Sequence, residues 1–509
     1  MNLIDKIISI FSPAAAFRRI QYRIAADTME QRRYDAAFGG NRTKNWRSQG
    51  LSANSEVGLA GAELRNRSRD LARNNPYSRK ALRVIPANVI GVGIQPSIRV
   101  PRSARQADAL KMAWKDWAGS ASCDWNGRKT FYAMQRLAFR AMLESGEVFI
   151  RRMVDKKGNA LGLQLQVLEA DHLDYTKDGV KLAGDGYIRQ GIEFDSRGKR
   201  VAYYLFDTHP GESRVNFKTT STRIPADQII HLFYEERPGQ DRGVPLGVAS
   251  MLRIRDFDDY EDAQLIRQKI AACFAAFITS DAHTVTPSQA ASNGGYDLER
   301  VEPGIIERLR PGESVAFGVP PTAEGYAEYS RKVLQGIGAG YDVTYEALTG
   351  DLSNVNFSSG RMGWIEFGRF VEEWQEHLVI PVLCARVFEW FLQFARIQGI
   401  IPESSQVSVS WTAPRREFVD PLKEIKALVE QARAGFISWQ EAVRMLGYDP
   451  EEIMDQLKID SAAFDSAGLK PYSDPRYDSN RVDNNPSEEL PPPNGQRHEN
   501  GAVFENMKN

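Results

Sequence analysis

The chain has 509 residues and a mass of 57.2 kDa, which is too long for one simple hydrophobic core and predicts two or more domains. Its 65 Lys and Arg against 66 Asp and Glu give a formal net charge of −1, so the whole molecule lacks the basic surplus typical of proteins that grip nucleic acid. Three widely separated cysteines, Cys123, Cys273 and Cys384, form no CxxC pair and argue against a zinc site or a disulfide framework.

The first 61 residues combine a short amphipathic start with many arginines and then a stretch rich in Gly, Ser and Asn. This composition predicts a mobile basic arm. From residue 62, the spacing of apolar residues predicts helices broken at Pro76 and Pro86, and further helices over 111–117 and 131–143. We find no run of about 18 apolar residues and expect neither secretion nor a membrane-spanning helix.

Strand signals dominate between Glu147 and Tyr234. Short alternating runs such as 163–167 and 201–205 are separated by turn residues, for example over 195–198. They predict a compact β-rich layer.

Two long helical segments are predicted on either side of a polar excursion. After the loop 237–243, the lack of Pro and Gly beyond Gly247 predicts one long helix over 244–279. The excursion spans 281–321, and helical character resumes from 323 to about 348.

A polar loop over 349–359 comes next, and its last serines, Ser358 and Ser359, are suitable N-caps for a long apolar helix. Pro381 should kink that helix. Tryptophans at helical spacing, such as Trp374 along it, predict core or interface packing.

The C-terminal region carries helix-capping residues. Asp420, Ser438 and Asp449 predict the starts of three short helices. Residues 471–509 are rich in Pro, Asn, Asp, Glu and Ser and are expected to be disordered.

Five short strings stand out along the chain. They are RNNP at 73–76, GVG at 91–93, RPGQ at 237–240 with Pro245 after it, YEDA at 260–263, and NFSSGR at 356–361. Their order and spacing between about residues 65 and 447 resemble those of the lambda-like family of tailed-phage portal proteins.

The resemblance implies an α+β portal fold with a mixed α/β wing, a helical stem, a small α/β clip, a long kinked helix and an α-helical crown. It further implies a dodecameric ring at one capsid vertex through which double-stranded DNA is packaged and ejected. The expected partners are terminase, a head–tail adaptor, and the major capsid and scaffold proteins. The protein would be assembled in the bacterial cytoplasm and reside in the virion, without catalysis, cofactor, metal or membrane.

Carried onto this sequence, the family's regions follow one another along the chain. They are a mobile arm (1–61), the first part of the wing (62–243), a stem helix (244–280), the clip (281–321), a second stem helix (322–348), the tunnel loop (349–359), the long kinked helix with the rest of the wing (360–419), the crown (420–470) and a disordered tail (471–509).

A channel that lets DNA slide must not hold it. Duplex DNA carries one negative charge per roughly 1.7 Å. The logarithm of the binding constant falls with the logarithm of the salt concentration, and each neutralised phosphate steepens this slope by about 0.9. One lysine from each of about twelve subunits would therefore bring the slope near 11, the value of a tightly bound protein. We therefore expect a near-neutral or acidic lumen. The candidate residues of the tunnel loop are Ser353, Asn354, Val355, Asn356, Phe357, Ser358, Ser359 and Arg361.

The channel-lining candidates of the stem are Asp256, Asp258, Asp259, Glu261 and Asp262. An ordinary solvated, salt-bridged helix face explains this acidic run equally well. For Arg361, an ion pair between subunits is favoured over contact with phosphate.

The sequence signals for nucleotide-binding, metal and base-reading sites are weak. There is no Walker A string, and the histidines lack metal-ligand spacing. The run 169–172 (EADH) reads as a polar turn, and the acidic C-terminal helices do not suit groove reading. A monomeric capsid adaptor or scaffold, and less so an enzyme acting on nucleic acid, remain the alternatives, and the state of assembly would discriminate between them.

Overall fold

The computed structural model describes residues 50–101, 103–212, 220–272, 276–280, 313–317, 325–414, 418, 420–471, 474 and 476. The chain divides after Glu56 into two compact units, and the features below belong to the second unit, apart from the first turn of helix α3. Almost all of the predicted arm and most of the predicted clip and tail lie outside the described residues.

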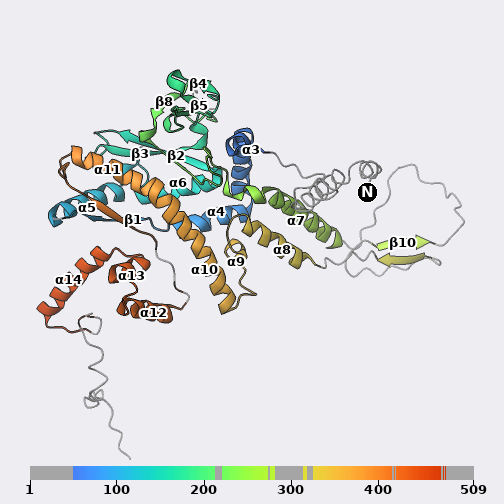
Figure 1. Ribbon diagram of the computed structural model, residues 1–509. Coiled ribbons are helices and arrows are strands. Elements are labelled where there is room, and N and C mark those ends of the chain that lie inside the picture. Colours follow the sequence, from blue (N-terminus) through green and yellow to red (C-terminus); the bar gives the residue numbers. More distant parts are fainter. Residues whose placement is uncertain are drawn as a thin grey trace, which may run out of the picture. The chain divides into compact units, whose positions relative to one another are not determined.

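Helices form the N-terminal part of the second unit (Figure 1). Helix α4 begins as predicted, because Asn75 accepts hydrogen bonds from the backbone N–H groups of Tyr77 and Ser78 at 3.1 and 2.9 Å, and Pro76 takes the first helical position. The prediction of a break at Pro86 was wrong, since α4 continues through this buried proline. The helices are α3 (Ala53–Asn74), α4 (Pro76–Val89), α5 (Ala104–Gly119) and α6 (Phe131–Ser145).

Helix α3 starts at Ala53, inside the segment predicted as a mobile arm. That boundary was therefore wrong. The Gly58 and Gly61 that suggested flexibility are accommodated within a helix of 22 residues. One face of this helix is held by ion pairs to the β-rich layer, and these contacts between distant parts of the sequence outweigh the weak helix propensity of glycine.

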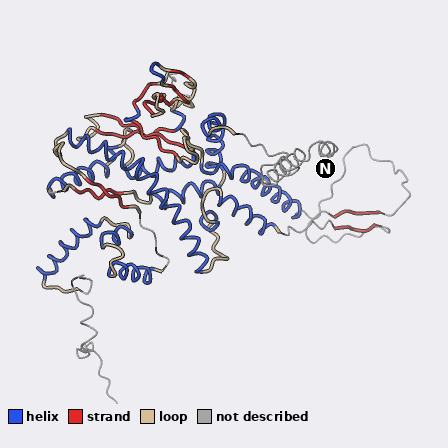
Figure 2. The backbone as a smooth tube through the Cα atoms, viewed as in Figure 1, coloured by secondary structure: helices blue, strands red, loops and turns tan. Residues whose placement is uncertain are grey.

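The β-rich layer predicted between 147 and 234 is confirmed (Figure 2). Its neighbouring strands pair antiparallel. A three-stranded sheet has the order β3-β2-β9, and a five-stranded sheet runs β4-β5-β6-β7-β8. The strands are β2 (Glu147–Val154), β3 (Leu163–Glu169), β4 (Val180–Lys181), β5 (Tyr187–Arg189), β6 (Ile192–Phe194), β7 (Arg200–Leu205), β8 (Thr222–Pro225) and β9 (Ile229–Phe233), while β1 (Gln95–Arg99) pairs with β12 (Ser408–Thr412).

The predicted long helix over 244–279 is shorter in the structure. A 3₁₀ turn, η6 (Leu246–Ser250), leads into α7 (Met251–Ala272), and residues 276–280 form strand β10 instead. Strand β10 (Ala276–Ser280) pairs antiparallel with β11 (Glu313–Phe317). The run AFITS contains aromatic and β-branched residues that favour strands, and a partner strand is available.

The second predicted stem helix is also divided. Helix α8 (Tyr326–Ala339) ends at Gly340, and α9 (Tyr345–Thr349) follows after a turn in which Asp342 has φ of +54°. Closely spaced glycines at the end of α8 disfavour helix continuation. The turn is fixed by Tyr341, whose buried ring lies against Gly247 and whose hydroxyl is 2.8 Å from Ser78 Oγ.

The long apolar helix is confirmed, with a change of geometry around Pro381. It comprises α10 (Phe357–Trp374), a π-helical segment η7 (Gln375–Cys384) and α11 (Ala385–Ile397). A kink was expected at Pro381, and the structure departs from α geometry there through a ten-residue π-helical segment. Residues 357–397 are long and apolar enough to cross a membrane by length and composition alone, and half of the most apolar window is buried inside the protein, as in a core helix.

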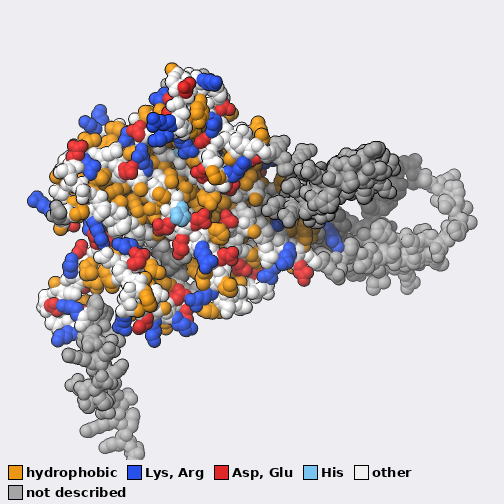
Figure 3. Space-filling model, viewed as in Figure 1, with side chains coloured by type: hydrophobic (Ala, Val, Ile, Leu, Met, Phe, Trp, Pro, Cys, Tyr) orange, Lys and Arg blue, Asp and Glu red, His pale blue; other side chains and the backbone are white. Residues whose placement is uncertain are grey.

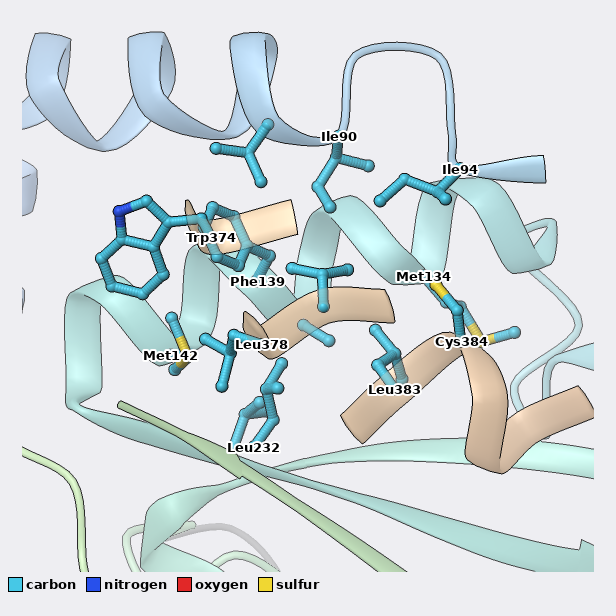
Figure 4. Packing of buried hydrophobic residues seen from close by; sticks show 14 of the residues in the cluster. Ile90, Ile94, Met134, Phe139, Met142, Leu232, Trp374, Leu378, Leu383 and Cys384 are labelled. Carbon is cyan, nitrogen blue, oxygen red and sulfur yellow. The ribbon is translucent and has the colours of Figure 1, made fainter. Parts of the chain in front are cut away.

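The core explains that apolar composition. Helix α6, the three-stranded sheet and the long helix enclose it, and the side chains of Phe139, Leu232, Trp374 and Leu383 meet there (Figure 4). Phe139 and Trp374 make an edge contact with ring centroids 5.5 Å apart. Burying each such side chain contributes about 1.5–3 kcal/mol.

Three capped helices near the C-terminus are confirmed: α12 (Pro421–Arg433), α13 (Trp439–Met445) and α14 (Pro450–Ala467), with Asp420, Ser438 and Asp449 as their N-caps. Arg476 lies within the predicted disordered tail, yet it pairs with Asp465 at 2.9 Å. The start of the predicted tail at 471 was therefore too early.

Candidate functional site

The loop between α9 and α10, residues 350–356, is the centre of the candidate site. Gly350 ends α9 with φ of +80°, a conformation that glycine adopts without strain. Asn356 begins α10: its side chain accepts from the backbone N–H of Ser359 at 2.8 Å, and Ser359 Oγ accepts from the backbone N–H of Asn356 at 3.2 Å. This reciprocal cap fixes where the loop meets the long helix.

The predicted end of the loop, at residue 359, was therefore too late. Phe357, Ser358 and Ser359 belong to the first turn of α10, and Asn356 is the N-cap in place of the two serines. Asparagine caps at least as well as serine, and its amide oxygen reaches the N–H three residues on.

Asp351 braces the start of the α9–α10 loop. One carboxylate oxygen accepts from the Tyr345 hydroxyl at 3.0 Å, and the other accepts from the backbone N–H of Ser353 at 3.0 Å. Hydrogen bonds from Ser353, followed by that from Tyr345, lower the pKa of Asp351. Nothing in the spacing of the sequence signals the bond between Tyr345 and Asp351, so Tyr345 could not be predicted as part of the site.

The loop presents an exposed polar surface with two apolar side chains. Ser353, Asn354 and Asn356 are exposed, while Leu352 and Phe357 remain 66% and 57% exposed. The structure thus brings the predicted residues together on one exposed segment.

A hollow of about 410 Å³ lies behind the α9–α10 loop. Its walls come from α4, α9, α10 and the loop itself, with Val84, Ala347, Val355 and Phe367 among the lining residues. The lining is mostly apolar. The loop is therefore not packed tightly against the body over this area.

Arg361 lies outside the loop and has a partner within the chain. Its Nη2 is 4.0 Å from Glu424 Oε1 on α12. Arg361 and Glu424 also line a second hollow of about 560 Å³ between α10 and the C-terminal helices. The expected ion pair between subunits is untested by this intramolecular contact.

The acidic run on α7 separates into two groups. Asp258 accepts from Asn75 Nδ2 at 2.8 Å, and Glu261 accepts from the Tyr326 hydroxyl at 3.1 Å. Burial raises the pKa of both carboxyls. These two side chains are therefore committed to contacts with α4 and α8.

The other three acids of α7 are exposed. Asp256, Asp259 and Asp262 are exposed, and Arg255 Nη2 lies 3.5 Å from Asp259 Oδ1. At about 100° per residue, positions 256, 259 and 262 share one broad face. Sequence alone could not separate them from Asp258 and Glu261.

A cluster of acids and one histidine forms beside α3. Ligand atoms of Glu169, Asp171 and His209 lie within 4.8 Å of one another. Arg69 Nη2 already bonds Glu169 at 2.7 Å and Asp171 at 2.5 Å, and Arg65 Nη1 is 3.3 Å from Asp171. Burial acts to raise the pKa of Asp171, but the two arginines outweigh it and lower the pKa.

The polar turn predicted at residues 169–172 is part of a larger cluster. The run 169–172 does form a turn, η3 (Ala170–His172), yet His209 joins it from a distant position. Because the guanidinium of Arg69 lies between the carboxylates, the cluster works as an ion-paired junction between α3 and the β-rich layer.

The described thiols are poorly suited to chemistry. Cys123 and Cys384 are buried and free. Burial raises the pKa of Cys123 to about 12 and that of Cys384 further still, so neither is a thiolate at neutral pH. Cys273 lies outside the described residues.

Comparison with known proteins gives consistent matches. Residues 39–375 match the family model "Phage portal protein, lambda family". The chain is 28% identical over 437 residues to a probable portal protein of Halomonas phage phiHAP-1, covering 80% of this chain and 82% of that protein. It is 23% identical over 490 residues to portal protein B of Escherichia phage lambda, covering 86% and 90%.

Among solved structures, a chain from the neck of a native GTA particle, computed with C12 symmetry, is similar with a TM-score of 0.43 and 15% identity. That match covers 75% of this chain and 94% of the other.

Proposed function

The chain belongs to the lambda family of phage portal proteins, and from this portal function we propose that it assembles into a dodecameric ring whose channel passes double-stranded DNA during packaging and ejection. The family is structural, and the protein's place is the virion capsid. We further propose that the protein has no catalytic activity of its own and is assembled in the host cytoplasm before terminase, and later a head–tail adaptor, dock on it.

The regions of the ring follow the helices. We assign the stem to α7 and α8, the clip to 281–321, the crown to 420–470, and the wing to 62–243 with the long helix. The antiparallel packing of α7 and α8, which lie side by side, supports the stem (Figure 1). Most of the clip falls outside the described residues.

The observation that carries the channel proposal is the exposed α9–α10 loop. It offers short polar side chains, which make weak and exchangeable contacts, and Leu352 and Phe357 are available for neighbouring loops. Arg361, the cation nearest to the loop in sequence, is turned toward Glu424. This composition suits a surface that touches DNA without holding it.

Charge supports the same proposal. The exposed Asp256, Asp259 and Asp262 are the acids of α7 that remain free to face a lumen, whereas Asp258 and Glu261 are engaged within the subunit. On the face drawn in Figure 3, charges of both signs are interspersed without a large area of one sign. Such a surface attracts DNA less than a basic one.

The test has two stages. Light scattering and negative-stain imaging of the purified protein should give a hollow ring of about twelve subunits, a number taken from the family. Removal of Leu352–Val355 keeps the Asn356 cap, and it should spare the ring but impair DNA packaging. Leu59→Ser, which replaces an exposed leucine outside the loop, is the control and should package normally.

Normal packaging by the shortened loop would overturn the tunnel-loop assignment. A stable monomer under several buffer conditions would instead favour the adaptor or scaffold reading. Nothing among the described residues favours the enzyme reading by a specific contact.

A further inference from the structure

Arg331, on α8, lies against two residues that hold the α9–α10 loop. Its guanidinium carbon is 5.2 Å from the centre of the Tyr345 ring, a cation–π distance. The side-chain amide of Asn354 faces the same guanidinium, and with its oxygen on that side it accepts hydrogen bonds from Nη1 and from Nη2, the latter at 3.3 Å. One half-buried arginine thus contacts both α9 and the loop.

Tyr345 extends this contact to the beginning of the loop. Its hydroxyl donates to Asp351 at 3.0 Å, and Asp351 in turn accepts from the backbone N–H of Ser353 at 3.0 Å. Arg331 also contributes to lowering the pKa of Asp351, after the hydrogen bonds of Ser353 and Tyr345. The four side chains Arg331, Tyr345, Asp351 and Asn354 therefore form one connected group, which we call the loop anchor.

Apolar packing does little to fix the same loop. The hollow of about 410 Å³ lies on its inner side, and Leu352 is 66% exposed. A segment with few buried apolar contacts has low local stability unless polar contacts hold it. The position of the loop then depends on the loop anchor.

We propose that Arg331 is the positioning residue that couples stem helix α8 to the α9–α10 loop, so that a displacement of α8 moves the loop with it. The inference rests on the proposed function, because it concerns how the channel loop is carried. Arginine suits the role because its planar group stacks on an aromatic ring and donates in a fixed fork, which lysine does not reproduce.

The first readout is amide hydrogen exchange of residues 350–356 in the assembled protein. Arg331→Met should raise exchange in this segment roughly ten-fold, because a stacked cation and its hydrogen bonds are lost. Arg331→Lys should give a smaller rise. Lys332→Met is the matched control: Lys332 is exposed on the same helix and bonds only Gln335 among the described residues, at 3.3 Å, so exchange in the loop should not change.

Tyr345→Phe provides a milder variant, since it removes only the hydroxyl that reaches Asp351. If Arg331→Met does not assemble, Tyr345→Phe and Arg331→Lys still test the anchor, and both should raise exchange at the Ser353 amide. Unchanged exchange over 350–356 in these variants would overturn the inference.

DNA packaging by the same variants separates the inference from the proposed function. Raised exchange with impaired packaging by intact rings supports both. If Arg331→Met raises exchange, and both this variant and the Leu352–Val355 deletion package DNA normally, the anchor is supported but the loop has no role in the channel.

Discussion

The carboxylate of Glu147 is fully buried and accepts a hydrogen bond from Arg242 Nε at 2.8 Å. Glu147 begins strand β2, and Arg242 belongs to the loop that leads toward α7. His231 Nε2 lies 3.0 Å away, the backbone N–H of Gly243 donates at 3.2 Å, and Arg65 Nη2 is 3.6 Å from the same carboxylate. The pair therefore joins the β-rich layer to the entry of the predicted stem.

Removing one partner of this pair should be costly. Glu147→Gln leaves Arg242 buried without its counter-charge, and we expect a loss of about 3–5 kcal/mol in the free energy of unfolding. Chemical denaturation of the unassembled protein measures it. Glu63→Gln, which breaks the exposed pair with Arg67, is the control and should change stability by less than about 0.5 kcal/mol. A loss at Glu147 no larger than this control would contradict the assignment.

Acidification should weaken the same junction. Burial lowers the pKa of His231 to about 4, below its unfolded value of about 6.5. The unfolded chain therefore binds more protons in this interval, and stability that is present above pH 6.5 is lost as the pH falls toward 4, by up to about 3 kcal/mol.

Glu147 adds to this loss at lower pH. Burial acts to raise its pKa, but Arg242 and His231 outweigh burial and hold the pKa well below its usual value. Its contribution is present above about pH 4.5 and is lost as the pH falls below that. Denaturation curves at several pH values measure both effects, and His231→Phe should flatten the part between pH 6.5 and 4. An unchanged slope in that variant would exclude His231 as the cause.

Gly146 is a position where a side chain should not fit. It ends α6 with φ of +89°, and an added Cβ would lie 2.7 Å from the backbone carbon of Val244. Gly146→Ala should cost about 1–3 kcal/mol. Gly119→Ala is the control, since Gly119 has open space around it and a negative φ. Thermal unfolding of the two variants should differ clearly, and equal melting temperatures would refute the close approach.

The cap of α10 gives a local test beside the channel loop. Asn356→Ala removes the side chain that accepts from Ser359 and should destabilise the start of the helix by about 1 kcal/mol. Ser358→Ala, two residues further along the helix, changes a side chain that takes no part in the cap and should be nearly neutral. Exchange of the Ser359 amide reports the difference, and similar rates in the two variants would argue against the cap.

The buried thiols predict a labelling pattern. Iodoacetamide at pH 8 should leave Cys123 and Cys384 unmodified in the native protein, since burial limits access and raises the pKa of both thiols. Mass spectrometry after denaturation should show both alkylated. Labelling of Cys384 in the native state would mean that the long helix opens.

Elements with local signals could be predicted from the order of the amino acids alone. The N-caps Asp420, Ser438 and Asp449 and the alternation of the β-rich layer follow from hydrogen bonds and periodicity within a few residues. The family likewise follows from short strings in order. The predicted helix ends near 279 and 348 were wrong. Residues 276–280 pair as strand β10 instead of continuing the first helix, and the packing of Tyr341 on Gly247 fixes a turn that divides the second.

Which side chains are engaged within the fold and which stay exposed depends on tertiary packing. Asp258 is engaged by Asn75 while Asp259 is exposed, although the two are neighbours in sequence. The contacts of Arg331 with Asn354 and of Glu147 with Arg242 join residues from separate elements. Such contacts join residues that are far apart in the sequence. They form only when the helices and strands pack together, so no local sequence pattern predicts them.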